Sequence, residues 1–385
     1  MKLRLSALIL SEFVNIVFPI LIIIYIISKN GMEFYGGYAL IVTGGTFLAC
    51  FITYGFQNLS VVNLKDKKFS NKELLLSILI YRILAFFVIC LLIFKIFPEQ
   101  VLVLLIVYTE VFSIKWYLFA NSKFENYFII TLSQRIIGLA FVVFVSVTGS
   151  VESLIWLIYI PQLSINIISV TILAIALHRD EISIMLNVKS FTSIVREGFW
   201  FFVARLNAIF SEKILIFLFG LTDDLKMIAT CDLIQRSTAG LMAQNNVLNQ
   251  YLFPILSEQR AHLSNAFFGF ASFILCLVVI VEIEVLLKIC KMIGFQHALL
   301  ETIQKEKVLI LAIVLLTSLS HNFGNLVSLL KTNSQRFLLT SLRATFLYAS
   351  ITISLYLTGF LNPLSLLVYP AILFGLRLKD SLKSW

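Results

Sequence analysis

The chain has 385 residues, of which 59% are hydrophobic, 14% aromatic and only 13% charged. A soluble domain is about 45–50% apolar and about 25% charged, so the composition excludes a soluble globular protein and indicates a polytopic membrane protein. The net charge of +9 does not indicate nucleic-acid binding, because the positive-inside rule already requires basic cytoplasmic loops. The five cysteines lie in or beside apolar runs without metal-ligand spacing, and we expect them to be packing residues.

The sequence predicts an all-α polytopic membrane protein with twelve transmembrane helices, because a bilayer is spanned by about 20 apolar residues. Placing both termini in the cytoplasm puts most of the loop lysines and arginines inside. The most polar interhelical segment, 179–196, separates residues 1–178 from residues 197–385, with six helices each. An even number per half favours two six-helix bundles related by a parallel repeat. The predicted spans are 8–28, 36–60, 74–97, 101–120, 127–149, 152–177, 197–221, 226–254, 263–286, 307–330, 337–358 and 361–378.

The stretch 196–260 carries the clearest polar pattern, in two apolar helices joined by a polar turn at 222–224. Polar and small residues of the second helix recur every three or four positions, which keeps them on one narrow stripe. One interpretation is an i,i+4 ion pair between Asp232 and Arg236 with close helix packing at the alanines. The other is the wall of a water-filled central cavity. The stripe consists of Asp232, Arg236, Ala239, Ala243, Asn246 and Gln250.

Charged residues inside predicted spans cost about 2.5–3.5 kcal/mol each at the bilayer centre, so they are expected to face water, a ligand or each other. Arg82 and Glu110 either pair with each other or line the cavity, and Arg135 either lines it or extends to the headgroups. The charged residues that lie inside the predicted spans and are candidates for lining the cavity include two more cations than anions, and a positively charged cavity suits a diphosphate. They comprise Arg82, Arg135, Arg205, Lys213 and Arg236 against Glu110, Glu212 and Asp232.

Motifs of catalysis are missing from the sequence. It has no GxxxxGK[ST] phosphate loop, no G-x-S-x-G nucleophile turn and no histidine pair with metal-ligand spacing. His321 is interpreted as a packing residue or a proton relay. We therefore predict no catalytic residue, no metal site and no cofactor, and expect a protein that moves a substrate.

Several degenerate motifs occur in a specific order along nearly the whole chain. They are TYGFQNLSV at 53–61, KWYLFANSKFENY at 115–127, SQRIIGLAFVVF at 133–144, EGFWFFVARL at 197–206, LIQRSTAG at 233–240, LFPILSE at 252–258 and HNFGNLVSLLKTNSQR at 321–336. With them the chain resembles the O-antigen flippases (Wzx-type) of the polysaccharide-transporter family. That family belongs to the superfamily of multidrug-and-toxin exporters and lipid II flippases. Asn121 departs from the glycine that relatives often carry there.

The resemblance implies two bundles around a central cavity in a bacterial inner membrane. It implies alternating access that moves undecaprenyl-diphosphate-linked O-antigen units to the periplasmic leaflet, for lipopolysaccharide biosynthesis. Arg82, Arg135, Arg205 and Arg236 would hold the diphosphate or charged sugars, and Gln57, Asn246 and Gln250 would meet sugar hydroxyls. Asp232, Glu212 and Glu110 are candidates for coupling to a proton or cation gradient. Further expected partners are membrane lipids, the O-antigen polymerase and a chain-length regulator.

Two other functions stay open at this point. One is export of small molecules such as drugs by a member of the same superfamily. The other is a membrane glycan polymerase or acyltransferase, which would be expected to carry a long periplasmic loop. The longest predicted outside loop, about 287–306, is short, so the polymerase or acyltransferase is the less favoured alternative.

Overall fold

The computed structural model describes residues 2–56, 59–60, 71–96, 101–120, 123–145, 149–178, 188–239, 304–330 and 334–382. These residues form helices and turns, without a strand in the described ranges. Six helices in this part of the chain are long and apolar enough to cross a membrane. The prediction of an all-helical membrane protein is confirmed to that extent, while the count of twelve helices in two bundles stays a prediction.

The chain divides into two compact units. Unit 1 comprises Met1–Lys29 and Gly37–Ile209, and unit 2 comprises Asn30–Gly36 and Phe210–Trp385. Three changes of unit therefore lie within helices, two in α1 and one in α8. The predicted division at 179–196 stays a prediction, since residues 179–187 lie outside the described ranges.

Helix α1 (Lys2–Thr53) contains a break at Gly31, whose φ of 86° and ψ of 176° are not helical. Residues 2–30 and 32–53 thus form two helical segments, where the sequence predicts spans 8–28 and 36–60. The connection is shorter than predicted because a single glycine makes the turn. Glycine reaches positive φ without the steric cost of a Cβ, so flanking residues such as Lys29 and Glu33 stay helical.

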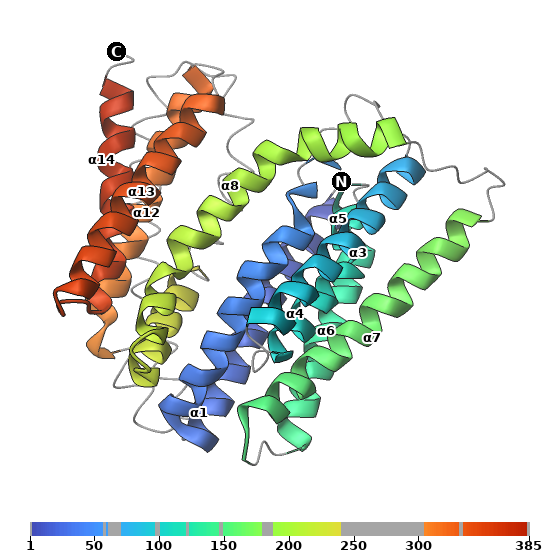
Figure 1. The fold of residues 1–385 in the computed structure, drawn as a ribbon, viewed down its shortest axis with the longest axis horizontal. Helices are drawn as coiled ribbons and strands as arrows, with labels where there is room; N and C mark the ends of the chain where they lie inside the picture. The colour runs from blue at the N-terminus through green and yellow to red at the C-terminus, as the bar shows by residue number, and fades with distance from the viewer. Residues whose placement is uncertain are drawn as a thin grey trace. The chain divides into compact units, whose positions relative to one another are not determined.

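Unit 1 contains α3 (Asn71–Ile96), α4 (Val101–Val111), α5 (Lys115–Ala120), α6 (Phe124–Phe144), α7 (Val151–His178) and the first part of α8 (Val188–Gly220). Contacts join α4 to both α3 and α7, and α6 to α7, as their ribbons in Figure 1 also show. Helix α3 presents an exposed apolar face that includes Leu84, Phe87 and Leu91. Because these side chains are apolar and exposed, this face is suited to lipid.

Three of the motifs meet in the core of unit 1. The ring of Tyr54 stacks on that of Phe202 at 4.7 Å between centroids, and both belong with Trp116 to one hydrophobic cluster. Gly55, with φ of +72°, brings its backbone against Phe201, where a Cβ would lie 2.8 Å from a main-chain carbon. The turn after α1 and the middle of α8, at Phe201 and Phe202, therefore need glycine at position 55 to pack.

The described part of unit 2 comprises residues 30–36, the second part of α8, a helix over 225–239, α12 (Lys307–Leu330), α13 (Ser334–Leu357), the 3-10 helix η2 (Pro363–Leu367) and α14 (Val368–Leu382). Helix α14 packs on α12 and α13. The buried Arg377 of α14 donates hydrogen bonds to the carbonyl oxygen of Ser320 at 2.8 Å and to its Oγ at 3.2 Å. Arg377 thus holds α14 and α12 together.

Candidate functional site

The predicted polar turn between α8 and the helix over 225–239 is present. Thr222 Oγ1 donates to the carbonyl oxygen of Phe219 at 2.8 Å, and the carboxylate of Asp224 accepts from the backbone N–H of Met227 at 3.0 Å. Asp223 adopts a positive φ of 56°. Short polar side chains cap helix ends and tolerate this backbone region, which explains why the chain turns here. The hairpin brings the two predicted charged helices together.

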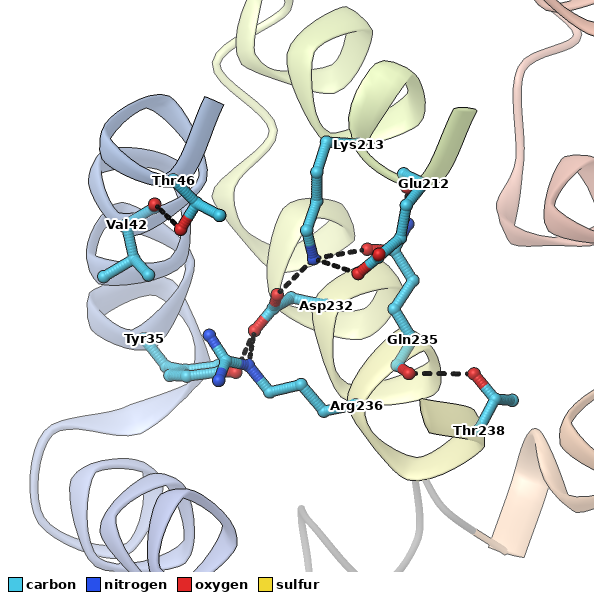
Figure 2. Close-up of polar contacts among 9 residues, drawn as sticks. All are labelled: Tyr35, Val42, Thr46, Glu212, Lys213, Asp232, Gln235, Arg236 and Thr238. Carbon is cyan, nitrogen blue, oxygen red and sulfur yellow. Dashed lines mark hydrogen bonds and ion pairs between the residues drawn. The ribbon is translucent and has the colours of Figure 1, made fainter. Parts of the chain in front are cut away.

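Asp232 lies at the centre of a charge cluster in unit 2 and is completely buried (Figure 2). Its Oδ2 accepts a hydrogen bond from Arg236 Nε at 2.6 Å and another from the hydroxyl of Tyr35. Lys213 Nζ lies 3.7 Å from the other carboxylate oxygen, Oδ1. The ion pair predicted from the i,i+4 spacing is thus present, and two further partners join it from elsewhere in the chain.

Lys213 connects Asp232 to the rest of the cluster. Its Nζ lies 2.9 Å from Glu212 Oε1 and donates to Gln235 Oε1 at 3.0 Å. Gln235 Nε2 in turn donates to the carbonyl oxygen of Glu212. The cluster holds two carboxylates and two cations, so its formal charges cancel. It therefore offers little of the predicted cationic surplus to an anionic substrate.

Residues 30–36 are attached to the start of the 225–239 helix at two further points. Glu33 and Lys226 form an ion pair at 3.2 Å between exposed side chains, and such a pair contributes only about 0–1 kcal/mol. The backbone of Gly36 lies so close to the carbonyl group of Leu225 that a Cβ would overlap it. The close approach at Gly36 and the buried Tyr35–Asp232 hydrogen bond are therefore the stronger attachments.

Arg82, predicted to pair with Glu110 or to line a cavity, is 3% exposed in unit 1. One of its terminal nitrogens donates to the carbonyl oxygens of Glu110 at 2.9 Å and of Ser113 at 2.7 Å. These carbonyls lie at the break between α4 and α5, within the single predicted span 101–120. Helix C-terminal carbonyls lack intrahelical donors and attract cations. Arg82 therefore stabilises the break, and within the described residues it forms no ion pair with the Glu110 carboxylate.

The two other arginines of unit 1 that were predicted to lie inside a span differ in exposure. Arg135 is half-buried in α6 and donates to Asn15 Oδ1 at 3.3 Å. Arg205 on α8 is exposed, and among the described residues it has no hydrogen bond or ion pair, although its charge acts on Arg82 and Cys50. Among the charged candidates for lining the cavity, these three arginines and Glu110 give unit 1 a surplus of two positive charges. The whole of the predicted surplus thus falls in unit 1.

Sequence reasoning missed a buried amide chain in unit 1. Gln134 Nε2 donates to Asn166 Oδ1 at 2.6 Å, and Asn166 Nδ2 donates to the carbonyl oxygen of Thr109 at 2.7 Å. Both side chains are almost fully buried. The available signal was an amide in the middle of each of two apolar spans. The two amides lie on different spans, so the sequence does not indicate that their side chains meet.

Other predicted positions lie outside the described residues: Gln57, Ala243, Asn246 and Gln250. The side chain of His321 is not described either, although its backbone is helical in α12. Ala239 is exposed at the end of the described stripe. Within the described ranges, no group of three histidine, cysteine or acidic residues could hold a metal ion.

No protein-family model and no curated protein matches the chain. Solved structures do match over almost its entire length. The MATE multidrug transporter DinF-BH is similar with a TM-score of 0.64 and 14% identity, over 99% of this chain and 94% of that one. An outward-facing MATE family multidrug resistance transporter of the MOP superfamily has a TM-score of 0.58 and 12% identity over the same shares.

A mutant of the Vibrio cholerae MATE transporter VcmN is similar with a TM-score of 0.56 and 12% identity, over 100% of this chain and 94% of that one. At such low identity, a likeness to solved structures concerns the fold. The matches cover this chain from end to end and all three structures are transporters of the MATE type. The chain therefore has the fold of the MATE transporters of the MOP superfamily.

Proposed function

We propose that this protein is a flippase that moves undecaprenyl-diphosphate-linked O-antigen units across a bacterial inner membrane by alternating access. The observation that carries the proposal is the distribution of charge in unit 1. Among the charged candidates for lining the cavity, unit 1 holds three arginines, Arg82, Arg135 and Arg205, and one carboxylate, Glu110. A surplus of guanidinium groups favours phosphate oxygens, which they bind in bidentate fashion, and disfavours cationic compounds.

Arg205 is the best candidate for direct contact with the substrate. It is exposed on α8 between apolar turns, and a charge there is stable only beside water or a ligand. Arg82 is committed to the α4–α5 break, and Arg236 is committed to Asp232. In this proposal Arg82 and Arg236 act by shaping their units, while Arg205, with Arg135 beside Asn15, binds the diphosphate. Gln57, Asn246 and Gln250 are proposed to meet the sugars.

We propose that coupling to a proton or cation gradient uses Glu212 or Glu110 in preference to Asp232. Asp232 already has Arg236, Lys213 and the Tyr35 hydroxyl as partners. Three such partners stabilise the ionised carboxylate and leave little room for a transported cation. Glu212 has an exposed side chain, and Lys213 is its one cationic partner among the described residues, so it exchanges a proton or cation more readily.

A small-molecule exporter is the second candidate, and the fold favours it as much as the flippase. The structures that resemble this chain are multidrug transporters by their own descriptions. Drug accumulation in cells that lack the gene separates the two functions. A flippase leaves accumulation unchanged and its loss depletes surface polysaccharide, whereas loss of an exporter raises accumulation.

The test of the flippase is complementation of surface polysaccharide in the deletion strain, with membrane insertion of each variant confirmed by fractionation. Arg205→Ala should abolish complementation and Arg205→Lys should retain part of it, because an ammonium keeps the charge without the bidentate geometry. Lys379→Ala is the matched control, since Lys379 is an exposed cation in the last turn of α14. Full complementation by Arg205→Ala would remove the proposed site.

The proposal also includes the membrane orientation of the protein and its partners. Both termini are proposed to lie in the cytoplasm, and the O-antigen polymerase and a chain-length regulator are proposed to act on the product. Reporter fusions to the two ends would test the topology. Activity of a periplasm-specific reporter at either end would contradict it.

A further inference from the structure

A small cavity of about 60 Å³ lies in unit 1 beside the break between α4 and α5. Its wall consists mainly of apolar side chains from α3, the α4–α5 junction and α7, such as Ile78, Ile114 and Val170. The polar contributions come from Arg82 and Ser113, and the ring of Trp116 closes one side. A cavity lined by hydrocarbon alone would stay dry. The guanidinium of Arg82 therefore determines which polar ligand this cavity can bind.

Arg82 is not fully satisfied by the protein. One terminal nitrogen bonds to two carbonyl oxygens, but Nε is buried and has no hydrogen-bond partner among the described residues. Leaving a buried charged donor without a hydrogen-bond partner is costly. The group that completes the site must therefore be a hydrogen-bond acceptor small enough for the cavity.

The local charge favours an anion over water alone. The guanidinium of Arg82 lies 5.8 Å from the centroid of the Trp116 ring and acts at longer range on two charged groups, the attractive Glu110 and the repulsive Arg205. Among the described residues the buried guanidinium forms no ion pair with the Glu110 carboxylate, so it lacks a counter-ion in direct contact. A buried charge without a counter-ion is costly, and an anion at Nε would offset it.

We propose that this cavity binds a small inorganic anion of halide size, held by Arg82 between α3, the α4–α5 break and α7. A cavity needs roughly 10–15 Å³ to hold one water, so about 60 Å³ has room for one halide with a few waters. A diphosphate-linked sugar does not fit. The anion is thus separate from the substrate of the proposed flippase, and it stabilises the break that Arg82 holds at Ser113.

Bromide quenching of Trp116 fluorescence tests the site directly, because the indole forms part of the cavity wall. The reporter protein carries Trp156→Phe, Trp200→Phe and Trp385→Phe, which leaves Trp116 as its only tryptophan. Bromide replaces gluconate at constant ionic strength in detergent-purified protein. We expect quenching that saturates, and chloride should shift the curve to higher bromide. Linear, purely collisional quenching would overturn the proposal.

Two variants locate the anion. Arg82→Gln removes the charge, and Val170→Phe fills the cavity without altering Arg82; both should lose the saturating phase. Arg135→Gln, which removes another arginine of unit 1, should keep it. If Arg82→Gln does not fold, as judged by gel filtration, the quenching curve of Val170→Phe alone tests whether the anion lies in this cavity. Saturation that persists in Val170→Phe would place the anion elsewhere. Competition by short-chain phosphatidylglycerol instead of chloride would assign the site to a lipid headgroup and also overturn the proposal.

Discussion

Tyr35 and Asp232 are 197 positions apart in the chain, and the phenol of Tyr35 donates a hydrogen bond to the carboxylate of Asp232 with both side chains fully buried. This bond attaches residues 30–36 to the helix over 225–239 inside unit 2. The carboxylate is also balanced by Arg236 and Lys213. The contact therefore joins a neutral charge cluster to a segment that begins one residue before the break of α1.

Tyr35→Phe should destabilise the purified protein by about 1.5–3 kcal/mol, the usual contribution of a hydrogen bond to a charged group. Thermal unfolding in detergent measures the change. Tyr108→Phe is the control, because the ring of Tyr108 packs against Phe86 and Phe112 and its hydroxyl has no hydrogen bond among the described residues. Equal effects of the two substitutions would show that the Tyr35–Asp232 hydrogen bond contributes nothing.

Asp232→Ala should cost about 3–5 kcal/mol, because it leaves Lys213 and Arg236 without their shared buried counter-charge. Adding Lys213→Met to Asp232→Ala should recover part of the loss, since one uncompensated cation is removed. A double-mutant cycle on unfolding midpoints gives the coupling. Strictly additive effects of the two substitutions would contradict the charge balance described for this cluster.

Gly36→Ala should lower the unfolding midpoint and the expressed yield, because the new methyl group would overlap the carbonyl of Leu225. The backbone at Leu225 cannot rotate away as a side chain can. Gly375→Ala is the matched control on α14, where a Cβ meets nothing within 4 Å. In a helix interior that control should be neutral or stabilising by about 0.5–1 kcal/mol. Indistinguishable midpoints for the two variants would rule out the close packing.

Asn166→Leu should destabilise unit 1 by about 1–3 kcal/mol, because it leaves the buried amide of Gln134 unpaired. The double variant Gln134→Leu/Asn166→Leu should be closer to the parent protein than Asn166→Leu is, since both polar partners are then gone. The order of the unfolding midpoints is the measurement. A double variant less stable than the single one would mean that the amides contribute more than their mutual hydrogen bond.

Local features of the sequence predicted the charged hairpin well. The polar residues at 222–224 mark its turn, and the spacing of four between Asp232 and Arg236 places their side chains on one helix face. Both signals depend on neighbours in the chain, so they can be interpreted without a structure. The pairing of Asp232 with Tyr35 and Lys213 depends on which helices meet, and no local pattern of the sequence contains that information.

The break between α4 and α5 was missed for a different reason. Residues 112–114 contain neither proline nor glycine, and apolar residues continue on both sides, so the segment was predicted to be one span. The break is stabilised from α3, where Arg82 supplies the donor for the freed carbonyls. A helix interruption that depends on a side chain about 30 positions away cannot be recognised from the interrupted segment alone.

Residues 30–36 belong to unit 2, although the residues on both sides of them belong to unit 1. This arrangement limits where the chain can be split into two fragments. A cut in the coding sequence at residue 209 would leave the Tyr35 side chain on the first fragment, so the second fragment alone would lack a hydrogen bond to its buried aspartate. Separately synthesised fragments should therefore need co-expression in the same cell to accumulate. Attempts to exchange one unit between homologous transporters should carry the seven residues from Asn30 to Gly36 along with the second unit.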